Sequence, residues 1–183
     1  VMASKIKVDT LETANGSGTI ALSNQLSGMT SASMPSGSVI QAITSGSSDF
    51  ARTTISSAGS WVNTNNVLSI TPSSSSSKIL VLATQPVLVS GTGSIMRGGV
   101  RLLRSINGQA DAVVWNVNSN VELVQVRNAS GEFNVIATIN LLESSGTTEA
   151  VTFRLQAYLT TGTSFVAWES VYGANITLME IKG

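Results

Sequence analysis

The stretch from residue 151 to residue 159 constrains the fold of this chain more than any other. Apolar side chains occupy every second position in it, and mostly polar side chains occupy the positions between them. A period of two is typical of a β-strand with one buried face, because successive side chains of a strand point to opposite sides. We predict that the apolar positions face an interior, either of a domain or of a subunit contact; they are Val151, Phe153, Leu155, Ala157 and Leu159.

Short strand patterns recur along the rest of the chain from residue 38 onward. We predict further strands at residues 39–44, 52–56, 61–70, 78–89, 95–106, 110–115, 121–127, 133–142, 165–172 and 175–181. Turn signals separate them about every 8–12 residues, and no stretch carries the helical period over the length of a helix. The sequence therefore predicts an all-β fold. A jelly-roll-like antiparallel β-sandwich fits best, and an up-and-down barrel is the alternative.

Several local signals predict how these strands are connected. Asn107-Gly108 is the strongest hairpin signal in the chain, because both residue types tolerate positive φ. Gly91-Thr92-Gly93 and residues 128–131 are also predicted as turns. A bulge or twist is expected near Leu102-Leu103, so that the flanking arginines stay in water.

A proline and a serine run bear on the apolar strand predicted at 78–89: the proline lies inside the strand, and the serines precede it. Pro86 lies inside it and predicts a bulge, an edge position or an end of pairing, because proline has no N–H to donate. A run of five serines, residues 73–77, comes before it. Its composition predicts a flexible connector.

Residues 1–37 differ from the rest of the chain. They hold two short alternating patterns around the turn signal Asn15-Gly16-Ser17-Gly18, and Pro35 and Gly37 close the segment. A lone two-stranded hairpin is marginal in water. We therefore predict a separate segment at 1–37 that attaches and trimerises, followed by a head domain at 38–183. The expected contact residues of the segment are Ile6, Val8, Leu11, Ile20 and Leu22.

Composition excludes several classes of function. The chain has no cysteine and no histidine, which removes disulfides, thiolate metal sites and the commonest general base. Its charged residues make up 11% of the chain and cancel to a formal net charge of zero. Nucleic-acid binding needs clustered lysine and arginine, and a membrane helix needs a long apolar run. We predict no cofactor, no metal site, no nucleic-acid partner and no membrane insertion.

Six stretches of this chain follow a pattern found elsewhere: Lys5-Ile6-Lys7-Val8-Asp9-Thr10-Leu11, residues 15–20, residues 34–41, Ile70-Thr71-Pro72 with the serines into residues 78–81, Arg101-Leu102-Leu103-Arg104 and residues 176–181. They resemble fibre-like virion proteins of marine bacteriophages such as cyanophages. The resemblance implies a phage structural protein, a homotrimer with a jelly-roll head that resides in the virion and contacts other capsid or tail proteins. If the head adheres to the host, a host surface glycan is an expected partner.

Three function hypotheses follow from these observations. The first is a trimeric tail or head fibre, or spike, that adheres to the host, and the second is a capsid decoration protein that binds no receptor. The third is a glycan depolymerase using Glu143 and Glu149, although both flank a turn where solvated charges are expected. Trp61, Trp115 and Trp168 are predicted either to pack in the core or a subunit contact, or to stack on a host sugar.

Overall fold

The computed structural model describes residues 34–45, 52–116, 123–168 and 173–183. The chain divides into two compact units, Val1–Ser33 and Met34–Gly183, and the described residues all belong to the second. Among them there is no helix of the length and hydropathy needed to cross a membrane. Their strands are β1 (Val39–Thr44), β2 (Arg52–Ile55), β3 (Trp61–Ile70), β4 (Lys78–Ile106), β5 (Ala112–Asn116), β6 (Val124–Ser144), β7 (Val151–Thr161), β8 (Ser164–Trp168) and β9 (Asn175–Ile181).

The long strand β4 organises the whole domain. On one side its residues 78–84 pair with β9, residues 87–90 with β8 and residues 97–106 with β7. On the other side residues 78–98 pair with β6 and residues 101–104 with β5. Every one of these pairings is antiparallel. β4 is therefore the strand that all parts of the sheet share.

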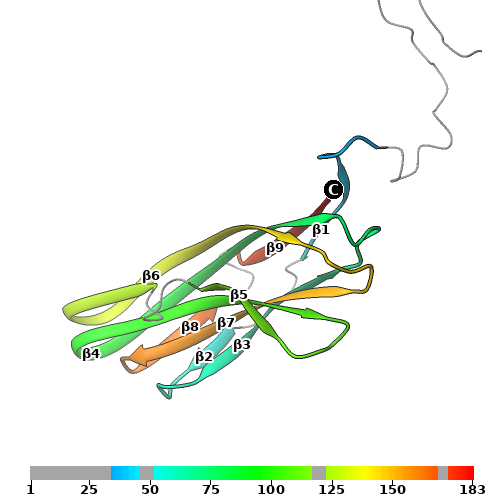
Figure 1. Ribbon diagram of the computed structural model, residues 1–183. Coiled ribbons are helices and arrows are strands. Elements are labelled where there is room, and N and C mark those ends of the chain that lie inside the picture. The colour runs from blue at the N-terminus through cyan, green and yellow to red at the C-terminus, as the bar shows by residue number, and fades with distance from the viewer. Residues whose placement is uncertain (1–33, 46–51, 117–122, 169–172) are drawn as a thin grey trace, which may run out of the picture. The chain divides into compact units, whose positions relative to one another are not determined.

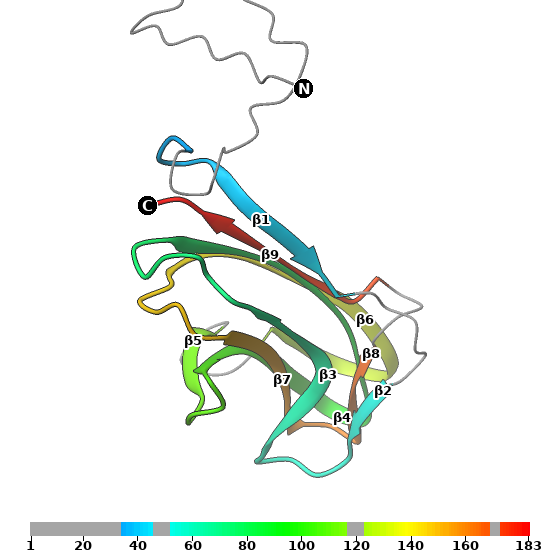
Figure 2. The ribbon, with the colours of Figure 1, turned by 90° about the vertical axis from the view of Figure 1, so that its right-hand side faces the viewer.

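Two layers result, because β4 curves from one into the other (Figures 1 and 2). The first layer contains β1, β9, β6 and the beginning of β4, and the second contains β3, β7, β5 and the end of β4. β8 and β2 pair beside the middle of β4. The predicted all-β, jelly-roll-like antiparallel sandwich is confirmed.

The period of two in β7 marks its buried face, as predicted. Val151, Phe153, Leu155, Ala157 and Leu159 are all 0% exposed, whereas the residues between them are half-buried. The first three pack with Ile79, Val81 and Ile139 of the first layer, and the last two pack with Val87, Val89 and Ala137. The core of the sandwich therefore lies between the two layers.

Pro86 lies where the neighbour of β4 changes from β9 to β8. Pairing with β9 ends at Thr84, and pairing with β8 begins at Val87. The predicted end of pairing is thus confirmed on this side of β4. The buried amide of Asn66 lies at this point, with its Nδ2 3.3 Å from the Thr84 oxygen and 3.5 Å from the Asn175 oxygen. It supplies polar contacts where the strand ladder is interrupted.

Two of the predicted turns are wrong. Gly91, Thr92 and Gly93 continue β4, and they pair with Gly131, Ser130 and Ala129 of β6. Within the described residues, the four predicted strands at 78–89, 95–106, 121–127 and 133–142 form two long strands, β4 and β6, whose register does not shift; residues 121 and 122 lie outside the described residues. Glycine permits a turn but does not impose one, and here two glycines meet across a continuous ladder.

Two other local predictions are confirmed. Asn107 and Gly108 have φ of 47° and 72°, and the Gln109 nitrogen donates to the Ile106 oxygen at 2.9 Å, which closes a tight hairpin turn. The register between β4 and β5 shifts between Leu102 and Leu103, which is the expected bulge.

Candidate functional site

One end of the sandwich gathers the two ends of the described domain. β1 begins there and β9 ends there, and the same end carries residues 71–77 and the turn after β6 (Figure 2). We call this the root end. Because the N-terminal segment continues into β1, the root end is where any attachment made by that segment is transmitted to the domain.

Hydrogen bonds join the first and last residues of the domain at the root end. The Gly37 nitrogen donates to the Lys182 oxygen at 2.9 Å, and the Lys182 nitrogen donates to the Ser38 oxygen at 2.9 Å. The Lys182 Nζ also donates to the Met34 oxygen at 2.6 Å. Residues 34–37 are therefore held to the β-domain, although the predicted division between Gly37 and Ser38 itself stays a prediction.

A buried carboxylate is the centre of the root end. Glu180 of β9 is 0% exposed. Its Oε1 accepts hydrogen bonds from the Ser73 nitrogen at 2.8 Å, the Ser73 Oγ at 2.7 Å and the Ser77 Oγ at 2.7 Å. Its Oε2 accepts from the Gln41 Nε2 at 2.8 Å. One side chain thus ties β1, β9 and the serine run together.

The serine run is not the flexible connector that its composition predicts. Besides the bonds to Glu180, Ser145 donates from its nitrogen to the Ser77 oxygen and from its Oγ to the Ser74 oxygen, both at 2.9 Å. Ser77 and Ser145 are 1% and 0% exposed. Small hydroxyl side chains here satisfy a buried acceptor and neighbouring backbone groups, so the run is a fixed loop.

The electrostatics of Glu180 follow from this arrangement. Burial of the carboxylate raises its pKa, but hydrogen bonds from Ser77, Gln41 and Ser73 lower the pKa by more, so it lies below the ordinary value of 4.5. Hydrogen bonds to the charged form favour that form. The ionised carboxylate therefore stabilises the fold above about pH 4.5, and this contribution is lost as the pH falls through the lowered pKa of the folded state.

We predict that Glu180→Gln lowers the free energy of unfolding by about 1–3 kcal/mol at neutral pH, because a side-chain amide cannot accept from all four donors. When the pH falls below 4.5, the free energy of unfolding of the variant should also decrease less than that of the wild type. Chemical denaturation across pH 3–7 measures both effects. Glu149→Gln is the matched control, since Glu149 is exposed in the loop after β6; an equal effect of the two substitutions would contradict the assignment.

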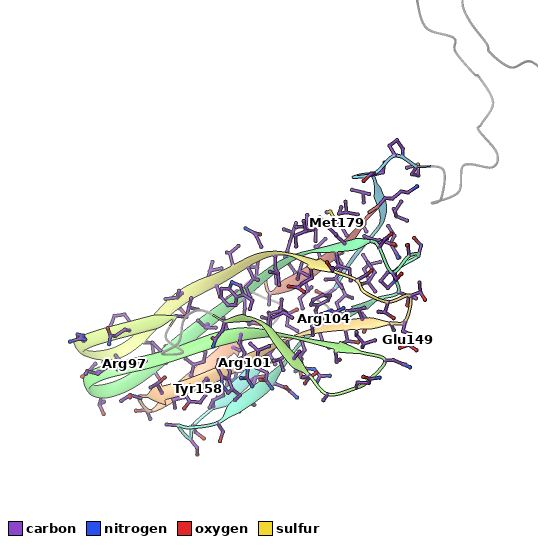
Figure 3. All side chains as sticks on the ribbon, in the orientation of Figure 1. Arg97, Arg101, Arg104, Glu149, Tyr158 and Met179 are labelled. Carbon is purple, nitrogen blue, oxygen red and sulfur yellow. The ribbon has the colours of Figure 1, made fainter. Side chains whose placement is uncertain are left out.

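Arg104 supports the same end from the second layer. Its guanidinium donates from one NH2 group to the Ser145 oxygen at 2.5 Å and to the Ser144 oxygen at 3.3 Å. These carbonyls belong to the last residue of β6 and the turn after it. Figure 3 labels Arg104 and Glu149 toward the root end, and Arg97 and Tyr158 toward the opposite end.

A second polar cluster lies on the outer side of the second layer. The Arg101 guanidinium carbon is 4.2 Å from the Trp61 ring centroid, and the Tyr158 ring centroid is 5.1 Å from that of Trp61. The Arg101 Nε donates to the Gln156 Oε1 at 2.7 Å, and the Gln156 Nε2 donates to the Asn63 Oδ1 at 2.7 Å. Trp61 is half-buried, and its ring already has a cation and an aromatic neighbour.

The other residues predicted to carry function lie in different places. Trp115 is half-buried and packs against both core clusters, which is the core role predicted for it. Trp168 is the last residue of β8 and pairs with Arg52 through the backbone. Its side chain is not among those that the structure describes. The predicted contact residues of the N-terminal segment lie outside the described residues; they are Ile6, Val8, Leu11, Ile20 and Leu22.

The predicted carboxylates of a depolymerase, Glu143 and Glu149, lie at the end of β6 and in the loop after it. Glu143 is half-buried at the end of β6, and Glu149 is exposed in the following loop, where its nitrogen donates to the Thr147 Oγ1. Within residues 34–45, 52–116, 123–168 and 173–183, no group of three or more histidine, cysteine, aspartate or glutamate side chains lies close enough to hold a metal ion.

Sequence reasoning missed Glu180 and Gln41. Both lie in stretches that carry the fibre-like resemblance, but their strand patterns predict only alternation. A signal was present, because a glutamate at an inward position of an otherwise apolar strand needs donors, and the serine run supplies them. The pairing itself depends on β9 returning beside β1, which is a long-range feature of the topology.

Comparisons with known proteins assign this chain to no family. No protein-family model matches the chain, and no curated protein matches it. Among solved structures, the chain is similar to one in "Structure of infectious bursal disease virus Gx strain", with 12% sequence identity and a TM-score of 0.38. The match covers 78% of this chain and 36% of that chain. A likeness this weak carries no argument about function.

Proposed function

We propose that this chain is a non-enzymatic structural protein of a bacteriophage virion, a trimeric fibre or spike that adheres to the host surface. Its N-terminal segment attaches it to the capsid or tail, and its β-sandwich forms the exposed head. The observation that carries the proposal is the root end, where Met34 and Gly37 are bonded to the last strand through Lys182.

The root end is suited to transmit a pulling force from the attached segment to the β-domain. A pull on residue 34 is passed to β9 through three hydrogen bonds and then to the long strand β4 through the antiparallel ladder. The fibre-like resemblance of residues 5–11 and 34–41 supports the same role. Several copies on one particle would convert a weak contact of each head with a host glycan into useful avidity.

A capsid decoration protein is the second candidate, and one observation favours it. Trp61 has Arg101 4.2 Å from its ring centroid and Tyr158 beside it, so the ring is engaged within the protein rather than presented to a sugar. A decoration protein needs the attachment segment and a stable head, but no receptor site. Binding of the purified chain to host-surface polysaccharide distinguishes the two, and release of reducing sugar from that polysaccharide would instead indicate the depolymerase.

We expect Ile20→Asp to reduce incorporation of the full chain into particles strongly, because it places a charge at a predicted apolar contact. Thr19→Asp is the matched control, since it adds the same charge at the neighbouring position on the other side of the strand pattern. The measurement is the amount of chain in purified particles. Thermal unfolding of residues 34–183 made alone should be cooperative; an unfolded fragment, or equal loss with the two substitutions, would contradict a separate attachment segment.

A further inference from the structure

We infer that the outer face of the first layer is the surface through which identical copies of this chain contact one another. This inference rests on the trimer of the proposed function and identifies the part of the head that forms it. Its central feature is a row of apolar side chains, one from each strand of the layer, which we call the apolar row: Ala42, Met179, Leu80 and Leu142.

The strand register shows that the apolar row is continuous. Ala42 of β1 is paired with Met179 of β9, and Met179 is also the partner of Leu80 in β4. Leu80 is in turn the partner of Leu142 in β6. Residues paired directly across strands lie on the same face about 5 Å apart. Figure 3 labels Met179 on β9, in the upper part of the domain.

These side chains point away from the core. Their neighbours along the strands, Ile79, Val81 and Leu178, are all 0% exposed and belong to the core. Alternation then places the apolar row on the opposite side of the layer. Leu142 is 53% exposed, and Ile136 on the same side of β6 is 62% exposed. Leu80, Leu82 and Met179 are half-buried.

The part of the face formed by β1, β9, β4 and β6 carries no charge around the apolar row. Between the rows of Lys78 and Glu132 at its two ends, the outward positions of these four strands are all apolar or neutral, and the nearest outward charge on a neighbouring strand is Arg52 of β2. Besides the apolar row, they include Leu82, Thr84, Asn134, Ile136, Thr138, Asn140, Asn175 and Thr177.

The edge of β6 also needs a cover. β6 is 21 residues long, pairs with β4 along one side without a register shift, and has no other strand partner among the described residues. Natural proteins protect such edges with charged side chains, proline or bulges, because an open edge invites pairing with other chains. Between Glu132 and Glu143, β6 has no charged residue and no proline.

A second copy of this chain is the occupant that these observations favour. Close to a threefold axis, the same residues of each copy meet one another, so a charge there would meet like charge. The neutral, four-stranded part of the face, with apolar side chains at its centre, avoids that repulsion and buries Leu142 and Ile136. A partner recognised by charge would find no charged side chain to select on these four strands.

A single cysteine tests the contact directly, because the chain has none of its own. The full chain carrying Leu142→Cys is treated with a short two-armed maleimide reagent and separated under denaturing conditions. We expect efficient formation of covalent dimers. The control is Val113→Cys, since Val113 is 49% exposed on β5, which belongs to the second layer. Equal cross-linking of the two variants, or none with Leu142→Cys, overturns the inference.

Charge insertion gives an independent readout. Ile136→Lys together with Leu142→Lys should weaken self-association of the full chain about tenfold or more, because a contact would bury unpaired charge. Sedimentation equilibrium measures this, and circular dichroism checks that the fold is kept. Val113→Lys should leave association unchanged. If the wild type is trimeric and all variants stay trimeric, only the interface is overturned; if the wild type is monomeric, the trimer of the proposed function is overturned with it.

Discussion

Replacing Phe153 with alanine is expected to lower the free energy of unfolding by about 3–5 kcal/mol. Phe153 is 0% exposed in β7 and packs in the core cluster with residues of both layers, such as Ile79 of the first and Ile70 of the second. Removing the ring leaves a cavity that strands on both sides hold open, so the site cannot collapse around the smaller side chain. Chemical denaturation of the purified chain measures the loss.

The neighbouring substitution Thr152→Ala controls for the position in β7. Thr152 is half-buried on the outer side, where its hydroxyl lies 2.7 Å from the Ser69 hydroxyl. Losing one exposed hydrogen bond should cost about 1 kcal/mol or less. Equal losses from Phe153→Ala and Thr152→Ala would contradict the assignment of the Phe153 face of β7 to the core and of the Thr152 face to the outer side.

The second large effect is expected at Gly98, where β4 passes the core ring of Phe165. A Cβ at this position would lie 2.1 Å from the Phe165 Cδ2 and 2.8 Å from the Tyr158 oxygen. Phe165 is 0% exposed and cannot move away freely. We therefore expect Gly98→Ala to destabilise the domain by about 3 kcal/mol or more, at the upper end of what overpacking a core costs.

A double-mutant cycle shows whether the Phe165 ring is the cause. In a background carrying Phe165→Leu, the added methyl group of Gly98→Ala has more room, so its cost should be smaller than in the wild type. Additive losses would contradict the proposed clash. They would instead place the effect in the backbone contact with the Tyr158 oxygen.

Local patterns predicted the fold class because alternation and turn signals act over a few residues. The β7 pattern predicted its buried face, Asn107-Gly108 predicted its turn, and Pro86 predicted a change of pairing. The glycines at 91, 93 and 131 were misread as turns, because the ladder of β4 and β6 that contains them is formed between distant parts of the chain.

The candidate site was harder to predict than the fold. Glu180, Gln41 and the serines of residues 73–77 are far apart in the sequence and meet only because β9 lies between β1 and β4. Composition alone favoured a flexible serine run, since nothing local reveals a buried acceptor. The contact residues predicted in the N-terminal segment, such as Ile20, stay a prediction, because they lie outside the described residues.

Analysis of purified virus particles tests the central proposal most directly. The proposal requires a virus that encodes this chain. Particles of that virus are purified, their proteins are identified by mass spectrometry, and an antibody against residues 34–183 is located on intact particles by electron microscopy. We expect the chain in the particles in a multiple of three copies, with the antibody bound at the particle surface. Purified particles that lack the chain, while infected cells contain it, would contradict a virion structural role.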